Sequence, residues 1–147
     1  MLCLEFNKLA WWYWLVADVL LMLALWVARD YFVAALAFNL FQLCHFILRQ
    51  RSFTTFPVQV RAGYWLWLLA GLAPGLFWMH WIQLAGTSAM LLFGYCPLAR
   101  MLSLLPWNRR QPFTLQFLLR TFLAPPTSGS IRDNPHLVTL HSEKPAV

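Results

Sequence analysis

The stretch LAWWYWLVADVLLMLALWVA, residues 9–28, decides the fold class of this chain. Its 20 residues include a single charged side chain, Asp18. An α-helix rises by about 1.5 Å per residue, so this stretch extends for about 30 Å as a helix, which is the thickness of the hydrocarbon core of a bilayer. We therefore predict that it crosses a membrane as a helix.

Two further stretches extend this pattern. Residues 31–48 contain no Asp, Glu, Lys or Arg, and neither do the 38 residues 62–99. The longer stretch exceeds one crossing and suffices for two, with a turn between Pro74 and Trp81. The sequence thus predicts an all-α integral membrane protein with four transmembrane helices as two hairpins, within 1–52 and 53–110. The remainder, 111–147, is predicted to hold a short interfacial helix within 112–123 and a flexible C-terminal tail.

The composition and the basic residues predict how the chain sits in the membrane. Of the 147 residues, 61% are hydrophobic and 11% charged, whereas soluble domains have about 25% charged residues. Most Lys and Arg fall on one side of the four predicted spans, so both termini are predicted to be cytoplasmic. The net charge of +6 is attributed to topology and to anionic lipids, not to nucleic acid. The arginines expected to contact lipid head groups are Arg49, Arg51, Arg61, Arg100, Arg109 and Arg110.

Polar residues inside the predicted spans are the first candidates for a site. Asp18 and Asn39 lie at the centres of the first two spans, and an antiparallel hairpin places them at one depth, with Gln42 one turn away. We interpret this set as a hydrogen-bonded clamp between the two helices. The alternative is a proton or ion relay, because an ionisable side chain within a membrane is by default a functional candidate.

Cysteines and histidines give a second candidate. Cys44 and Cys96 are predicted to lie near the cytoplasmic ends of the second and fourth spans, where His45 would complete a thiol or soft-metal site. The alternative is that each cysteine packs as a small apolar residue. His80, between Trp78 and Trp81, is expected at the opposite interface, and the small and polar residues from Gly86 to Ser88 are attributed to helix packing. No bound metal or other cofactor is expected.

One stretch, residues 58–108, has an ordered set of small and aromatic positions. It contains Arg61-x-Gly63, a first span, an aromatic turn, Leu84-x-Gly86 and then FGYCPL at 93–98. This order resembles the transmembrane hairpin domain of inner-membrane rhodaneses, a hairpin that also occurs alone in small uncharacterised bacterial membrane proteins. Its most specific piece is Gly94-x-Cys96-Pro97-Leu98. The resemblance implies a bacterial inner membrane and an association with sulfur-transfer proteins, and it covers no part of the rhodanese catalytic domain.

These observations lead to an expected function without catalysis. We expect a small inner-membrane protein that acts as an accessory or assembly subunit of a larger membrane complex, with the bilayer and other membrane subunits as its partners. Two alternatives stay open. One is a sulfur- or thiol-handling membrane protein, which draws on Cys96 and the resemblance. The other is a small transporter or channel, which draws on Asp18.

Overall fold

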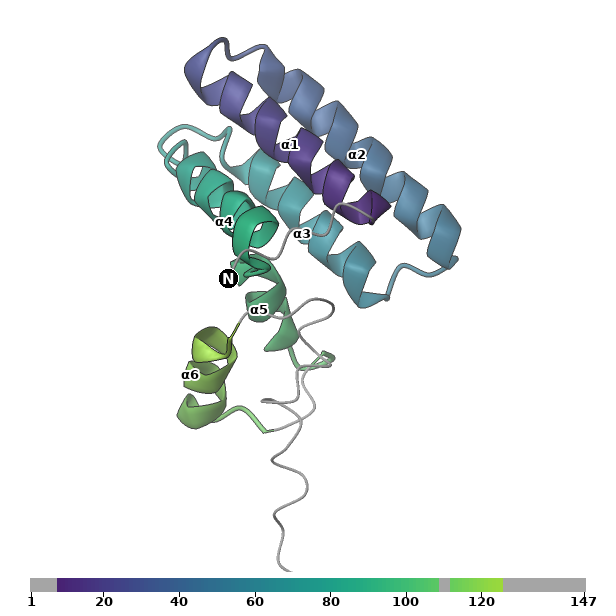
Figure 1. Ribbon diagram of the computed structural model, residues 1–147, viewed down its shortest axis with the longest axis vertical. Coiled ribbons are helices and arrows are strands. Elements are labelled where there is room, and N and C mark those ends of the chain that lie inside the picture. Colours follow the sequence, from purple (N-terminus) through teal and green to yellow (C-terminus); the bar gives the residue numbers. More distant parts are fainter. Residues whose placement is uncertain (1–7, 109–111, 126–147) are drawn as a thin grey trace, which may run out of the picture.

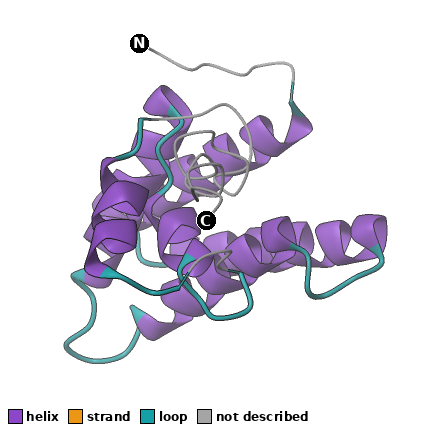
Figure 2. Cartoon of the chain, turned by 90° about the horizontal axis from the view of Figure 1, so that it is seen from below, coloured by secondary structure: helices purple, strands orange, loops and turns teal. Residues whose placement is uncertain are grey.

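The computed structural model describes residues 8–108 and 112–125, and this part of the chain is all-helical (Figures 1 and 2). The predicted all-α fold class is therefore confirmed for these residues, and the predicted tail after Pro125 lies outside them. The described residues form six helices: α1 (Leu9–Trp26), α2 (Tyr31–Gln50), α3 (Phe56–Ala70), α4 (Met79–Phe93), α5 (Pro97–Ser103) and α6 (Leu115–Leu123).

Two of the described helices have the length and apolar composition to cross a membrane. These are α1, with 18 residues, and α2, with 20. A third crossing is added if α4 and α5, which meet at an angle of 97°, are counted as one broken span. Helices α3 and α4 have 15 residues each, or about 22 Å of helix, which is shorter than the bilayer core of about 30 Å.

The first four helices pack side by side as an antiparallel bundle (Figure 1). Helix α1 packs against α2 and α4, and α3 packs against the same two neighbours, so α1 and α3 occupy one diagonal of the bundle. Two apolar clusters fill its interior, because each helix turns a stripe of large side chains inward. The first consists of Trp14, Ala17, Phe56, Val60, Tyr64 and Leu91, and the second of Leu21, Ala24, Phe32, Ala35, Leu68 and Leu84.

The connections between the first four helices lie close to their predicted positions, except that the connection between α2 and α3 is shorter than expected. The turn between α3 and α4 covers residues 71–78 and uses Gly75 at a φ of 84°. The uncharged stretches 31–48 and 62–99 leave residues 49–61 between them, but the connection in the structure is shorter, because α2 continues to Gln50 and α3 already begins at Phe56. Pro57 fits the first turn of α3, where its missing N–H has no helical partner to lose.

A sharp bend follows α4 and carries the chain away from the bundle axis. Gly94 ends α4 in the left-handed conformation, with a φ of 70°. Pro97 then starts α5, which packs against α3 and α4, and α6 packs against α5 (Figure 1). Helix α6 lies within the segment predicted to hold a short helix, and the Thr114 hydroxyl caps it by accepting from the Phe117 N–H at 3.1 Å.

Candidate functional site

A row of polar side chains lies on the face of α4 that points into the bundle. His80, Gln83 and Thr87 are spaced by three and four residues, so they share one face of the helix. Their exposed fractions are 0%, 7% and 5%. Since polar residues rarely occupy a bundle core, this face is the first candidate for a site.

Asp18 of α1 meets this face of the bundle through Ser88, the residue after Thr87. The Ser88 hydroxyl donates to Oδ2 of Asp18 at 3.0 Å, and Asp18 is buried. The partner of this acid is therefore on α4. Asn39 donates instead to the carbonyl of Ala35 at 2.8 Å, within its own helix.

The clamp predicted between α1 and α2 thus takes a different form. Gln42 does connect the two helices, because its amide donates to the carbonyl of Tyr13 at 3.1 Å. Asp18 forms no hydrogen bond with Asn39 or Gln42 in the described part of the chain. An antiparallel hairpin fixes the depth of a residue, but its position around the helix decides which neighbour it faces, and Asp18 faces α4.

Tyr64 of α3 approaches the same polar face from the other side. The Gln83 amide donates to the Tyr64 carbonyl at 3.1 Å, and the Thr87 hydroxyl donates to the Gln83 carbonyl at 2.8 Å. The Tyr64 ring is buried and its hydroxyl lies close to the Thr87 side chain. Residues of α1, α3 and α4 are therefore connected along this face by the hydrogen bonds of Gln83 and Ser88.

His80 is buried inside the bundle, in the first turn of α4 and next to the connection from α3. Its ring centroid is 4.5 Å from that of Phe32 and 5.4 Å from that of Phe77. The ring also packs closely against Gly71, where an added Cβ would lie 2.5 Å from Cε1 of His80. A glycine at the end of α3 therefore makes room for this imidazole.

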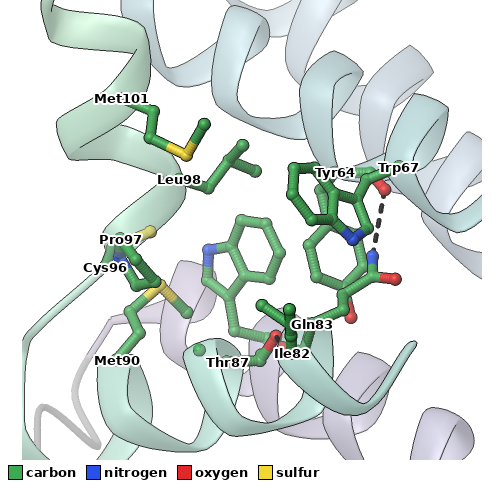
Figure 3. A pocket seen from close by; sticks show the side chains of 12 residues that line it. Tyr64, Trp67, Ile82, Gln83, Thr87, Met90, Cys96, Pro97, Leu98 and Met101 are labelled. Atoms are coloured by element: carbon green, nitrogen blue, oxygen red, sulfur yellow. Dashed lines mark hydrogen bonds between the residues drawn. The ribbon is translucent and has the colours of Figure 1, made fainter. Parts of the chain in front are cut away.

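A cavity of about 70 Å³ adjoins the polar face (Figure 3). In Figure 3, Tyr64 and Trp67 of α3 lie on one side of it, and Leu98 and Met101 of α5 lie on the other. Its walls are mostly apolar, with Cys96 among them. The complete lining is Trp14, Tyr64, Trp67, Ile82, Gln83, Gly86, Thr87, Met90, Cys96, Pro97, Leu98 and Met101.

The structure does not assemble the predicted thiol or metal site. Cys44 is exposed on α2 and Cys96 borders the cavity beside α5, while His45 packs against the ring of Tyr13 at 5.7 Å. Among residues 8–108 and 112–125, no three His, Cys, Asp or Glu side chains gather closely enough to hold a metal ion. Cys44 belongs to α2, whereas Cys96 caps the start of α5, which packs against α3 and α4.

The arginines predicted to contact lipid head groups fall into two groups. Arg49 and Arg51 are exposed, whereas Arg61 and Arg100 are 6% and 1% exposed. Arg61 lies over the Phe46 ring at 3.4 Å from its centroid and donates to the carbonyl of Pro57 at 3.1 Å. Its long side chain thus links α2 and α3 from within. Arg109 and Arg110 lie outside the described residues.

Arg100 holds α6 in place. Its guanidinium donates to the carbonyls of Thr121, Phe122 and Pro125, and it lies 4.1 Å from the ring centroid of Tyr95. The Tyr95 hydroxyl donates to the same Phe122 carbonyl at 2.9 Å. These donors satisfy carbonyls at the end of α6 that have no partner within the helix, and the positive charge suits that end of the helix dipole.

Comparisons of this chain with protein-family models, with curated proteins and with solved structures find no match. The candidate site therefore rests on the geometry above.

Proposed function

We propose that this chain is a non-catalytic accessory or assembly subunit of a larger complex in a bacterial inner membrane. In this proposal the bundle crosses the bilayer four times with both termini in the cytoplasm. The proposal includes the resemblance of residues 58–108 to the hairpin domain of inner-membrane rhodaneses, which is the reason for naming a bacterial inner membrane. Two apolar helices of membrane-spanning length, α1 and α2, support the membrane location.

The observation that carries the accessory role is an apolar face on α6 that residues 8–108 and 112–125 leave uncovered. Leu115, Leu119 and Leu123 follow one another at a spacing of four residues, and their exposed fractions are 69%, 51% and 79%. The opposite face, with Phe117 and Thr121, is buried. An exposed stripe of large apolar side chains marks a contact surface.

Arg100 gives this surface a fixed orientation. A short helix of nine residues is marginal by itself, and the three carbonyls that accept from Arg100 fasten its end to α5. A helix that is held on one side and apolar on the other suits a partner subunit, because little conformational freedom remains to be lost on binding.

Purification of the full chain from its native membrane in mild detergent tests this proposal. We expect a second membrane protein to co-purify in a fixed ratio. The triple variant Leu115→Ser, Leu119→Ser, Leu123→Ser should release it. The matched control is Phe53→Ser, which removes an equally exposed apolar side chain (74%) from the loop between α2 and α3. A wild-type chain that purifies alone, or a partner retained by the triple variant, would contradict the proposal.

A second candidate function is thiol or sulfur handling, and one observation favours it. The Cys96 side chain borders the cavity between α3, α4 and α5, where a small sulfur-containing group could reach it. If this function is correct, a persulfide formed at Cys96 should be detected by mass spectrometry after incubation with a sulfane-sulfur donor. Exposed Cys44 serves as the comparison thiol, and equal modification of both cysteines would remove Cys96 as a specific site.

A further inference from the structure

Eight buried side-chain N and O atoms have no hydrogen-bond partner in the described residues, and five of them belong to side chains at or beside the polar face of α4. These five are Oδ1 of Asp18, the hydroxyl of Tyr64, Nδ1 and Nε2 of His80, and Oε1 of Gln83. All four side chains are more than nine-tenths buried. Burying a polar atom without a partner is unfavourable, and buried water is a common partner for such atoms. We propose that these side chains form an internal water-binding site that connects His80 to Asp18.

The polar groups follow one another across the bundle with short steps. His80 and Gln83 are one helical turn apart on α4, and Gln83 is hydrogen-bonded to the backbone of Tyr64. The Tyr64 hydroxyl lies beside Thr87. The next residue, Ser88, binds Asp18. Water molecules therefore need to bridge only neighbouring side chains.

The cavity provides space for water beside the middle of this row. Tyr64, Gln83 and Thr87 form one part of its lining, and its volume of about 70 Å³ compares with about 30 Å³ for one water molecule in the liquid. The cavity is therefore large enough to hold water.

The donors and acceptors of the site match the chemistry of water. Oε1 of Gln83 and Oδ1 of Asp18 accept hydrogen bonds, the Tyr64 hydroxyl donates one, and a neutral His80 has one donor and one acceptor nitrogen. Water can satisfy both kinds of group at once. This inference does not depend on the accessory role.

Radiolytic hydroxyl labelling of the full chain in lipid nanodiscs tests the site, because radicals formed from internal water oxidise the side chains beside it. Each rate is divided by the rate of the same residue in the unfolded chain. We expect Tyr64 and His80 to be oxidised several-fold faster than Leu21 and Phe56, two residues buried in the apolar clusters. Equal rates for all four residues would overturn the proposal.

A pair of variants tests the position of the water. Gln83→Leu removes the central amide at similar volume, and labelling of Tyr64 should then fall to the level of Leu21. Asn39→Leu is the control, because it removes another buried amide whose nitrogen is bonded within its own helix. It should leave labelling of Tyr64 unchanged, and an equal loss in both variants would contradict the assignment. The wild-type rates decide the proposal if Gln83→Leu does not fold.

Discussion

Gly71 and His80 show how a single missing side chain shapes the interior at the residue scale. A Cβ on Gly71 would lie 2.5–2.9 Å from three atoms of the imidazole ring, which is closer than van der Waals contact permits. The ring is held on its other sides by Phe32 and Phe77. It therefore has little room to move, since packed interiors resist even one additional methyl group.

We predict that Gly71→Ala destabilises the protein by about 1–3 kcal/mol, the usual cost of overpacking a core. Thermal unfolding in detergent, followed by circular dichroism, measures the effect as a lower melting temperature. Gly63→Ala is the matched control, because its Cβ would meet Leu102 at 3.4 Å and needs only a small adjustment of that flexible side chain. An unchanged melting temperature for Gly71→Ala would show that His80 can leave its position.

Asp18 shows what the sequence could and could not predict about a single side chain. Its location in the middle of an apolar span follows from counting residues, and its burial is confirmed. Its partner could not be predicted, because the position of a residue around its helix axis depends on which helices pack together. Ser88 belongs to a small and polar stretch that any helix interface would accept, so nothing in the sequence singled it out.

The contact between Asp18 and Ser88 gives the second prediction. Asp18→Asn should keep most of the stability, because the amide oxygen still accepts from the Ser88 hydroxyl. Asp18→Leu and Ser88→Ala should each cost about 0.6–1.7 kcal/mol, the range measured for hydrogen bonds between membrane helices. Combining Asp18→Leu with Ser88→Ala measures the coupling of the pair. Fully additive losses would mean that the two side chains do not stabilise each other.

At the scale of elements, the bend between α4 and α5 places α5 against α3 and α4, and α6 against α5. The uncharged run 62–99 was predicted to end as a membrane span, whereas the structure ends α4 at Phe93 and turns the chain by 97°. Gly94 and Pro97 carry the local signal for this turn, since one adopts a left-handed φ and the other starts a helix. Hydropathy alone does not detect it, because both sides of the bend are equally apolar.

The third prediction concerns Arg100, which fastens α6 to α5. Arg100→Ala should leave the carbonyls of Thr121, Phe122 and Pro125 without this donor, and α6 should separate from α5. We expect faster hydrogen–deuterium exchange throughout Leu115–Leu123. Arg100→Lys should restore only part of the protection, because a lysine lacks the planar fork that reaches several carbonyls.

Arg49→Ala provides the comparison for this prediction, since it removes an exposed arginine from α2 and should not affect exchange in α6. Arg100→Lys keeps the positive charge but loses the planar guanidinium, so partial protection of α6 in this variant would show that both the charge and the guanidinium geometry contribute. Unchanged exchange in Arg100→Ala would mean that apolar packing alone holds α6.

At the scale of the whole molecule, helix length identifies only α1 and α2 as candidate membrane spans, whereas helix packing places α3 and α4 beside them. Helices α1 and α2 match the bilayer core, whereas α3 and α4 are shorter but pack alongside them. The order of the first four helices could be predicted from the hydropathy pattern, whereas the separate helix α5 was not predicted. The packing partners of the first four helices could not be predicted, because sequence spacing does not distinguish neighbours from diagonal positions in a four-helix arrangement.

The last prediction is the topology of this bundle, tested in a chain whose native cysteines are replaced by serine. The three connections alternate between the two ends of the bundle, so Asp30 and Gly75 lie at one end and Ser52 at the other. If all four helices cross, a cysteine introduced at Asp30 or Gly75 should react with a membrane-impermeant maleimide in intact cells. A cysteine at Ser52 or Thr114 should react only after the membrane is opened. Asp30 is exposed beside Arg29, in a connection with little positive charge, which favours the outer side. Labelling at Asp30 but not at Gly75 would mean that only α1 and α2 cross, and that the shorter α3 and α4 enter and leave on the cytoplasmic side.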